Sequence, residues 1–413
     1  MYDPNNDTPL PFLTADLEGV SGDLKVRVED FCVEELPSYA PCGYGTHTYA
    51  LVEKTGLPTM EVAARIAREL GVARRDVGYA GLKDARAVTR QWMSIEHVDP
   101  ARFAAVNIPR IRILATARHT NKLKPGHLAG NRFIIRLRNL DRPPAEAAAL
   151  AERIMDVLVR RGVPNYFGQQ RFGNRNDTHL LGRAICSEDV DEFFDIFLGR
   201  PSPEESARVE AARTLYEAGD YEKALGAWPA NCADQRRALR ALIKANGNRA
   251  RAFKSVDKHL RGFFVSAFQS SLFNQCLAVR MPRIDTLLNG DMACKHINGA
   301  CFTVIDAAVE QPRCDAFEIS PTGPLLGHRM YRLTGPAGDI ENPILEAAGL
   351  TDNHLTTMQR FGGRGGRRTL RFQPRNAALA TPVDARGPCL ELQFELDAGC
   401  YATGVVREIT KSN

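Results

Sequence analysis

The sequence predicts an α+β protein in which a helix-rich segment interrupts a strand-rich domain. Residues 1–140 contain several segments in which apolar and polar residues alternate, as they do in half-buried strands. Residues 176–281 instead repeat apolar residues at helical spacing, and strand patterns return at 370–372 and 390–396. Because the two ends of a domain commonly lie close together on its surface, this order indicates an insertion within a split domain.

The length and composition indicate a folded protein with more than one core. A chain of 413 residues is expected to form two or three domains, and 44% hydrophobic with 25% charged residues are ordinary values for a globular protein. No segment has the pattern of a signal peptide or the length of an apolar membrane span. We therefore expect a cytoplasmic protein with no membrane partner, and a monomer as the simplest state.

The cysteines and histidines do not follow the spacing of metal sites. Ten cysteines are scattered from Cys32 to Cys400 without a C-x-x-C pair, so we expect reduced thiols. The nine histidines show neither H-x-x-x-H nor H-E-x-x-H spacing, and we expect no metal. The motifs G-x-G-x-x-G and G-x-x-x-x-G-K-[ST], which bind nucleotides, are also missing, so no cofactor is expected.

The first part of the chain alternates strands with one well-marked helix. A strand is predicted over 25–33, with a bulge at Glu29-Asp30 where the alternation slips by one residue. The helix that follows is expected to have Thr59 as its N-cap and to stop at Gly71. Two further strands are predicted at 110–115 and 131–138.

The rest of the chain is predicted from helix signals and then from strand signals. A helix over 144–161 is closed by Gly162 and Pro164. Within the helical segment, residues 215–225 resemble one helical hairpin, with no second copy at a fixed period. After the strand at 390–396, a turn and a short helix end the chain.

One carboxylate, Asp84, lies in a loop that is otherwise basic. The segment GYAGLKDARAVTRQ (78–91) predicts a strand that ends at Gly81, a loop, and then a second strand. Three basic side chains share this segment: Lys83, Arg86 and Arg90. Neighbouring positive charge favours an ionised carboxylate, which can act as a nucleophile or base. The loop alone is also consistent with a carboxylate that only pairs with an arginine to fix the backbone.

Basic residues are concentrated in three blocks. Residues 110–142 contain nine Lys or Arg against Asp141, and residues 236–261 contain nine more against Asp257. A flexible glycine- and arginine-rich loop spans 362–368. Phosphate groups are natural partners for such blocks, although any one block alone is equally typical of a solvated helix face.

Five segments, in this order, resemble motifs of the TruD family of tRNA pseudouridine synthases. They are EDFCVEE (29–35) preceded by Lys25, GLKDARAVTRQ (81–91), GNRF (130–133) preceded by ARH (117–119), PNYFGQQRFG (164–173) and AGCYATGVVRE (398–408). The resemblance spans positions 25–408. Two features depart from the family: Val28 replaces a usual proline, and the helical part around 200–250 is longer than in compact bacterial members and matches no motif.

The resemblance implies both a fold and an activity. It implies a pseudouridine-synthase-like catalytic domain with a mixed or antiparallel sheet, formed by residues 1–161 and 367–413. An inserted TRUD-type α+β domain, rich in helices and formed by residues 162–366, would complete a V-shaped cleft for RNA. The implied reaction converts uridine to pseudouridine in tRNA, at uridine 13 of the D-arm, without a cofactor. The reaction moves the glycosidic bond from N1 to C5 of the base, which agrees with the missing nucleotide motifs.

The same resemblance assigns roles near the catalytic centre. Asp84 is the catalytic residue, which can stabilise or trap positive charge at C1′ of the ribose or take a proton from the sugar. Phe133 stacks on the flipped uracil, Asn131 holds the loop or the base, and Lys25 is the charged partner of Asp84. Two alternatives stay open, since Phe133 has the spacing of a core residue of its strand and Lys25 that of a solvated lysine.

The cations around these positions are assigned to the RNA-binding surface. The predicted substrate-binding cations are Lys83, Arg118, His119, Lys122, Lys124, Arg367 and Arg368, with Arg364 beside the last two. Two rival interpretations belong to other classes. A non-catalytic RNA-binding protein would keep the basic surface without needing Asp84, and an RNA methyltransferase would need the cofactor loop that this sequence lacks.

Overall fold

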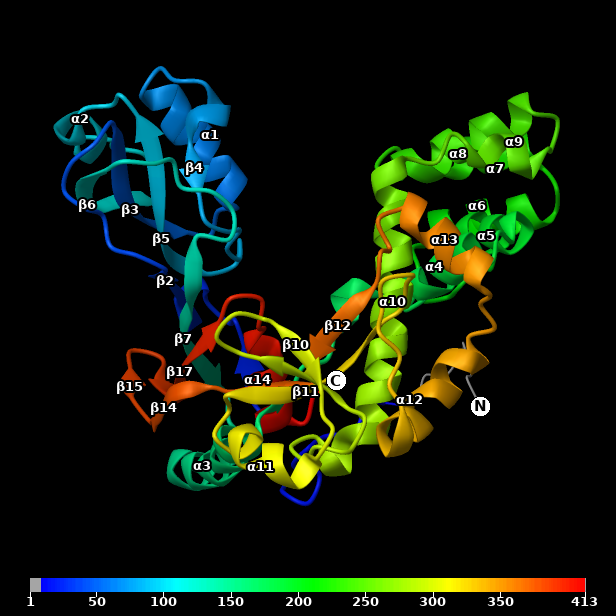
Figure 1. Ribbon diagram of the computed structural model, residues 1–413. Helices are drawn as coiled ribbons and strands as arrows, with labels where there is room; N and C mark the ends of the chain where they lie inside the picture. The colour runs from blue at the N-terminus through cyan, green and yellow to red at the C-terminus, as the bar shows by residue number, and fades with distance from the viewer. Residues whose placement is uncertain (1–8, 413) are drawn as a thin grey trace. The chain divides into compact units, whose positions relative to one another are not determined.

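The computed structural model describes residues 9–412, and the chain divides into two compact units (Figure 1). Of the described residues, the sheet unit comprises 12–163 and 372–412, and the helical unit comprises 9–11 and 164–371. The helical unit is thus inserted into the sheet unit, and both contain helices and strands. The α+β prediction is confirmed. The predicted domain boundaries, at 161/162 and 366/367, remain a prediction about separately folding domains.

The sheet unit is built on one mixed sheet. Its strands are β1 (Asp23–Leu24), β2 (Phe31–Pro37), β3 (His47–Thr55), β4 (Gly78–Tyr79), β5 (Val88–Glu96), β6 (Ile111–His119), β7 (Leu128–Arg138), β14 (Arg375–Ala380) and β17 (Leu390–Asp397). The order is β14-β17-β7-β2-β5-β3-β6, with β1 beside β7 and β4 beside β5. The β2–β5 pair is parallel, and the other pairs are antiparallel. A small hairpin, β15 (Val383–Asp384) and β16 (Gly387–Pro388), follows β14.

Four helices belong to the sheet unit: α1 (Thr59–Glu69), α2 (Pro100–Ala104), α3 (Pro144–Arg161) and α14 (Ala402–Thr410). Helix α1 buries Val62 and Ile66 against β3 and β5, whose Val52 and Met93 belong to the same core. The predicted stop of this helix is confirmed, because Gly71 adopts φ +65° directly after its C-cap. The helix predicted over 144–161 has these bounds in the structure.

A buried carboxylate joins the first and last described parts of the sheet unit. Glu408, on α14, accepts hydrogen bonds from the backbone N–H groups of Leu13 (2.9 Å) and Thr14 (3.1 Å), and from the Thr14 hydroxyl (2.7 Å). Only 1% of Glu408 is exposed. Hydrogen bonds from uncharged donors to a buried carboxylate satisfy the charge locally, so this contact fixes both segments in one place.

Two local predictions were wrong for the same physical reason, a hydrogen bond from a distant part of the chain. The strand predicted over 25–33 begins only at Phe31, because residues Val28–Asp30 form a 3₁₀ turn. The Asp30 carboxylate closes that turn by accepting from the Arg27 N–H (2.9 Å) and from Arg138 Nε (2.8 Å). Thr59 is the first helical residue rather than the N-cap, since its hydroxyl bonds to Gln91 (2.9 Å).

The helical unit contains the predicted run of helices and a second, smaller sheet. Its helices are α4 (Thr178–Cys186), α5 (Val190–Leu198), α6 (Ala207–Glu217), α7 (Tyr221–Ala227), α8 (Ala233–Lys244), α9 (Arg249–Phe253), α10 (Lys258–Arg280), α11 (Ala307–Asp315), α12 (Gly335–Ala347) and α13 (Asp352–Arg360). The sheet has the order β10 (Cys301–Thr303), β9 (Met292–Lys295), β11 (Ile319–Leu325) and β12 (Gly366–Thr369). Helices α6 and α7 form the predicted hairpin. Two short strands, β8 (Val163–Pro164) and β13 (Arg371–Phe372), occur where the chain passes between the units.

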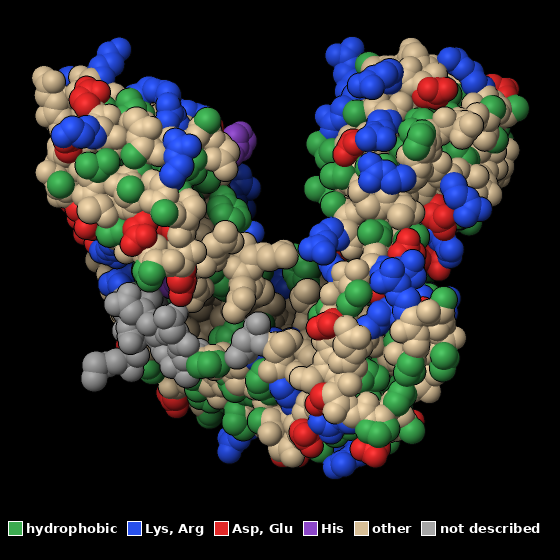
Figure 2. Space-filling model, turned by 180° about the vertical axis from the view of Figure 1, so that it is seen from behind, with side chains coloured by type: hydrophobic (Ala, Val, Ile, Leu, Met, Phe, Trp, Pro, Cys, Tyr) green, Lys and Arg blue, Asp and Glu red, His purple; other side chains and the backbone are tan. Residues whose placement is uncertain are grey.

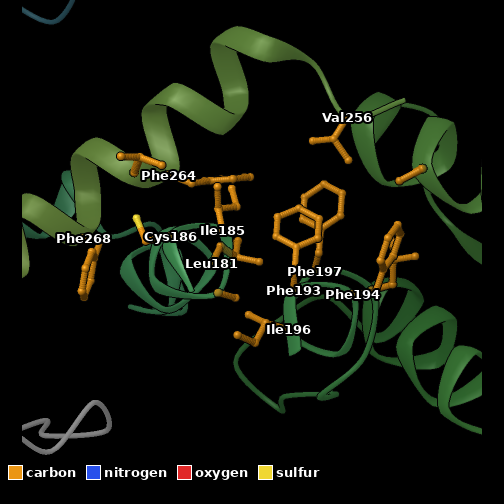
Figure 3. Close-up of a cluster of buried hydrophobic side chains, with 14 of the residues drawn as sticks. Leu181, Ile185, Cys186, Phe193, Phe194, Ile196, Phe197, Val256, Phe264 and Phe268 are labelled. Atoms are coloured by element: carbon orange, nitrogen blue, oxygen red, sulfur yellow. The ribbon is translucent and has the colours of Figure 1, made fainter. Parts of the chain in front are cut away.

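The helical unit has an aromatic core of its own. Phe193 stacks on Phe197 with ring centroids 5.3 Å apart, and Phe264 from α10 lies 6.0 Å from Phe197. Figure 3 shows these rings beside Ile185 and Leu181 of α4. Buried aromatic side chains contribute large apolar areas to stability. The long helix α10 is therefore held along its length by packing rather than by its own propensity.

Residues 9–412 contain neither a membrane-spanning helix nor a metal-binding cluster. No helix in that range is long and apolar enough to cross a membrane. No group of three or more His, Cys, Asp or Glu side chains in the same range is arranged to hold a metal ion. The ten cysteines, all of which the structure describes, form no disulfide.

Candidate active site

Asp84 lies in the loop between β4 and β5, as the sequence predicted, and its side chain is 52% exposed. The nearest cation is Lys25, whose Nζ lies 3.9 Å from an Asp84 carboxylate oxygen. Lys25 has φ +53° and its Nζ is 4.1 Å from the centre of the Phe31 ring. The predicted pairing of these two charges is therefore present, and the carboxylate remains open to solvent.

Lys83 does not face solvent but ends in a buried polar cluster. Its Nζ lies 2.9 Å from Glu35 Oε2 and donates to Asn131 Oδ1 at 2.7 Å. The two side chains of the ion pair are 4% and 1% exposed. Burial raises the pKa of Glu35, and the charge of Lys83 opposes that rise. Since Glu35 and Asn131 are directly paired on β2 and β7, Lys83 ties the loop to the centre of the sheet.

The loop backbone is fixed at three further points. The Lys83 N–H donates to the Thr59 hydroxyl at 2.9 Å, and Gln91 Nε2 donates to the Gly81 carbonyl at 3.1 Å. Lys54, on β3, donates from Nζ to the Asp84 carbonyl at 2.7 Å. Sequence reasoning missed all three roles. Lys54 and Gln91 occupy ordinary polar positions of their strands, and the only signal was that Gln91 belongs to the motif at 81–91.

The two glycines of the segment differ in what their missing side chains allow. A Cβ at Gly78 would lie 2.4 Å from the Leu123 carbonyl oxygen, so the neighbouring backbone requires glycine there. A Cβ at Gly81 would meet nothing closer than the Lys83 ammonium at 3.9 Å. Packing therefore requires glycine at position 78, whereas a Cβ at Gly81, three residues before Asp84, would make only ordinary contacts.

Phe133 lies on the buried face of β7. It is 7% exposed, its ring stacks on Phe394 of β17, and its edge contacts Phe31 with centroids 6.3 Å apart. Phe31 is the ring over which Lys25 lies. Phe133 thus has the surroundings of a core residue, and it contacts the ring over which Lys25 lies.

The predicted cations of the sheet unit fall into two groups. Arg118 and His119 lie opposite Thr48 and His47 on β3, whereas the other end of the same ladder pairs Lys54 with Ile111. Seven strand residues span about 23 Å, so these two side chains are distant from the Asp84 backbone. His119 is 8% exposed and stacks on Tyr39 with centroids 5.0 Å apart.

Lys122 and Lys124 belong to the segment that precedes β7. Lys122 donates to the Arg75 carbonyl, while the Lys124 side chain is exposed. This segment contacts the start of the Asp84 loop, because the Gly126 N–H donates to the Ala80 carbonyl at 2.8 Å. Of these cations, Lys124 is the one best placed to meet a ligand of the loop.

Arg367 and Arg368 lie on β12 of the helical unit. The Arg367 guanidinium donates to both carboxylate oxygens of Glu341, at 2.6 and 2.8 Å, and its side chain is 4% exposed. Arg368 lies over the Phe167 ring at 4.5 Å and donates to Asn165. Arg364, just before β12, is exposed. The Arg367 guanidinium is therefore already paired and buried, so the structure does not support the predicted role of Arg367 in substrate binding.

The arrangement can support catalysis by a carboxylate. Asp84 is accessible, its backbone is held from β3, and a lysine lies within ion-pairing distance of its oxygens. Hydrogen bonds to the rest of the loop reach α1, β5, β2 and β7. A carboxylate whose backbone is held in place and whose oxygens are open to solvent is suited to act as a nucleophile or base on a ligand brought to it.

Comparisons with known proteins agree on one family. A family model described as tRNA pseudouridine synthase D (TruD) matches residues 10–409. The tRNA pseudouridine synthase D of Geobacter sulfurreducens is 45% identical over 97% of this chain and 96% of its own length. The corresponding protein of Geobacter metallireducens is 44% identical over 97% of both chains. A solved structure named for tRNA pseudouridine synthase D of Methanosarcina mazei superposes with a TM-score of 0.87 at 27% identity, covering 98% of this chain and 96% of that one.

Proposed function

Because this chain belongs to the TruD family of tRNA pseudouridine synthases, we propose that it isomerises a uridine of tRNA to pseudouridine with Asp84 as the catalytic carboxylate. The family resemblance predicted from five sequence motifs is thereby confirmed. The observation that carries the role of Asp84 is its position: the carboxylate is 52% exposed and 3.9 Å from Lys25, in a loop anchored by buried hydrogen bonds.

The reaction breaks the bond from ribose C1′ to uracil N1 and forms one from C1′ to C5, so no atom is gained or lost. A carboxylate assists it either by attack at C1′ or by taking a proton from the sugar. Lys25 lies within ion-pairing distance of Asp84 at the start of either route. The detached base must turn before it rejoins, so a surface that holds the base near C1′ is needed.

The base has to leave its stack to reach Asp84. Gly81 and Leu82 come just before Asp84 in the chain, and 68% of Leu82 is exposed. Asn131 contacts Lys83, and Phe133 contacts Phe31. We assign uridine 13 of the D-arm as the target, on the strength of the motifs at 81–91 and 130–133.

Replacement of the carboxylate tests the proposal. Asp84→Asn keeps the size of the side chain, and we expect tRNA binding to persist while pseudouridine formation falls below detection. Asp76→Asn is the matched control, because Asp76 is another exposed carboxylate of the same unit and lies outside the loop. Pseudouridine yield equal to wild type in Asp84→Asn would remove the catalytic role. A wild-type protein that binds tRNA and forms no pseudouridine would identify a non-catalytic RNA-binding protein instead.

The position in tRNA has a separate test. Pseudouridine is mapped in two tRNA transcripts that differ only in having uridine or cytidine at position 13. We expect modification of the first at that position and no modification of the second. Pseudouridine at another position of both transcripts would overturn the assigned target and leave the reaction itself in place.

A further inference from the structure

Two loops of the helical unit cross at a pair of glycines. We call residues 327–332 and 360–366 the paired arginine loops. A Cβ on Gly327 would lie 2.5 Å from the Gly365 nitrogen, and one on Gly365 would lie 2.7 Å from the Gly327 Cα. The Arg329 N–H donates to the Arg364 carbonyl at 2.9 Å. The backbones of the two loops are therefore in direct contact. The hydrogen bond between Arg329 and Arg364 places these two arginines side by side at the contact.

Arg367 holds the first of these loops in place. Its guanidinium is fixed by Glu341 and also donates to the Tyr331 carbonyl (3.3 Å) and the Thr322 carbonyl (2.7 Å). The family resemblance assigned Arg367 to the RNA surface, and the structure gives it a supporting position instead. A buried arginine held by a bidentate ion pair is a rigid base for the exposed residues around it.

Four exposed side chains of the paired arginine loops are arginines. They are Arg329, Arg332, Arg360 and Arg364, and within residues 9–412 none of the four forms an ion pair. Tyr331 is 50% exposed among them. Figure 2 shows Lys and Arg side chains scattered among Asp and Glu side chains over the face in view. Charge that is unneutralised and carried on a fixed backbone suits a polyanion, since little conformational freedom has to be given up on binding.

We propose that the paired arginine loops bind the sugar-phosphate backbone of the RNA substrate through Arg329 and Arg364. This inference rests on the proposed function, because it takes the polyanion to be tRNA. Arginine presents several N–H donors in a planar fork that matches phosphate oxygens. The loop at 362–368 is evident in the sequence, whereas Arg329 joins it only in the fold, since 35 residues separate Arg329 from Arg364 in the chain.

The test compares Arg329→Ala/Arg364→Ala with Arg283→Ala. Arg283 is an exposed arginine of the same unit and lies outside both loops. The dissociation constant for tRNA is measured at several salt concentrations. We expect the double variant to bind about tenfold or more weakly at moderate salt, and the slope of log K against log salt to fall by about 0.7–0.9 for each phosphate that is no longer neutralised.

The outcomes separate the inference from the proposed function. An unchanged salt slope in the double variant, with wild-type pseudouridine formation, overturns the phosphate contact and leaves the activity in place. Unchanged tRNA binding would instead assign the loops to another anionic partner, such as an acidic protein surface, and overturn the inference equally. A wild-type protein that forms no pseudouridine would count against the proposed function and not against the loops.

A second, independent observation concerns Lys54. This residue is 0% exposed, and its ammonium donates to the Asp84 carbonyl at 2.7 Å. Burial lowers the pKa of Lys54 to about 8, and the charge of Asp84 is the main opposing influence. The other charge that acts on Lys54 is that of Lys83, while its neighbours across β5 and β6, Thr89 and Ile111, are uncharged. A buried ammonium is costly, so a purely structural position would favour an apolar side chain.

We infer that Lys54 is a positioning residue, which holds the Asp84 backbone and places a positive charge at the base of the Asp84 loop. Lys54→Met keeps the chain length and removes the charge. Val52→Ala is the matched control, because Val52 is a fully buried residue of the same strand and its truncation perturbs the core without touching the loop. We expect the single-turnover rate to fall about 100-fold in Lys54→Met, with tRNA affinity nearly unchanged, since small misplacements of a catalytic group have effects of about this size.

The pH profile gives a readout that a structural role would not change. The wild-type rate should fall as pH rises through about 8, because Lys54 then loses its proton. Lys54→Met should lack that decline. A decline of equal size in Lys54→Met would overturn the inference, and so would a single-turnover rate in Lys54→Met equal to that of the wild type.

Discussion

The ring of Phe133 stacks on that of Phe394, with centroids 5.6 Å apart and planes inclined by 29°. The family resemblance assigned Phe133 to the flipped base, and the structure gives it a neighbour across the β7–β17 ladder. Both rings contribute to the core, and only Phe133 also contacts Phe31, beneath Lys25. Paired substitutions can therefore separate packing from a role in the reaction.

Phe133→Leu and Phe394→Leu are expected to have similar effects on stability. Each replaces an aromatic ring by a smaller side chain in the same core, and the free energy of unfolding should fall by about 1–3 kcal/mol. Urea unfolding at neutral pH measures this. If Phe133 also acts on the base, its variant should lose much more of the single-turnover rate than Phe394→Leu does. Equal rates in the two variants would restrict Phe133 to packing.

Breaking the Lys83–Glu35 pair should destabilise the sheet unit. Lys83→Met leaves the Glu35 carboxylate buried without its cation, and such a change costs about 3–5 kcal/mol. The double variant Glu35→Gln/Lys83→Met removes the stranded charge as well, so it should regain part of the loss. Denaturant unfolding of the wild type, the single variant and the double variant gives both values. A double variant less stable than Lys83→Met would contradict this account.

The two glycines before Asp84 should respond differently to alanine. Gly78→Ala puts a Cβ 2.4 Å from the Leu123 carbonyl oxygen, and such overpacking costs about 1–3 kcal/mol. Gly81→Ala meets no atom closer than 3.9 Å, so its stability should match that of the wild type. If substrate contacts the backbone at Gly81, this variant should still lose affinity or rate. Thermal unfolding together with steady-state kinetics compares the two.

The free energy of unfolding should depend on pH in the acid range because of the Asp384 carboxylate. Hydrogen bonds from Arg138 lower the pKa of Asp384 to about 2, from an ordinary value of 3.8. A lowered folded-state pKa stabilises the protein above pH 3.8, and this contribution is lost as pH falls toward the folded-state value. Asp384→Asn should therefore be less stable than wild type at about pH 5 and approach it at the acid end. The control is Asp156→Asn, at an exposed position of α3, and its free energy of unfolding should change with pH as that of the wild type does.

Much of the fold followed from local signals in the sequence. Helix α3 has the bounds that Pro144 and Gly162 indicated, because proline and glycine act through the backbone of their own positions. The β4–β5 loop and its carboxylate were also predicted, since strands and their end loops leave a period-two pattern. The turn at Val28–Asp30 was not, because Arg138, which closes it, is brought there by the fold.

The same distinction explains the candidate site. The motif at 81–91 indicated Asp84, and Lys25 was recovered by resemblance to a family. Lys54 has no local signal, because a lysine near the end of an amphipathic strand is ordinarily solvated. The burial of Lys54 and its hydrogen bond to the Asp84 carbonyl, 30 positions along the chain, arise only when the sheet has folded. For the same reason, the sequence did not show that the Arg367 guanidinium is paired with Glu341, because only the folded chain brings these two residues together.

Strand order in the sheet unit has a consequence for how the protein is made. β7 lies between β2, an early segment, and β17 (Leu390–Asp397), which leaves the ribosome after the whole helical unit. The helical unit can fold while translation continues, whereas a nascent chain that stops at Pro388 leaves one edge of β7 bare. The strand that carries Asn131 thus gains its final neighbour only at the end of synthesis, so a half-made enzyme can hold a folded helical unit beside an unfinished catalytic sheet.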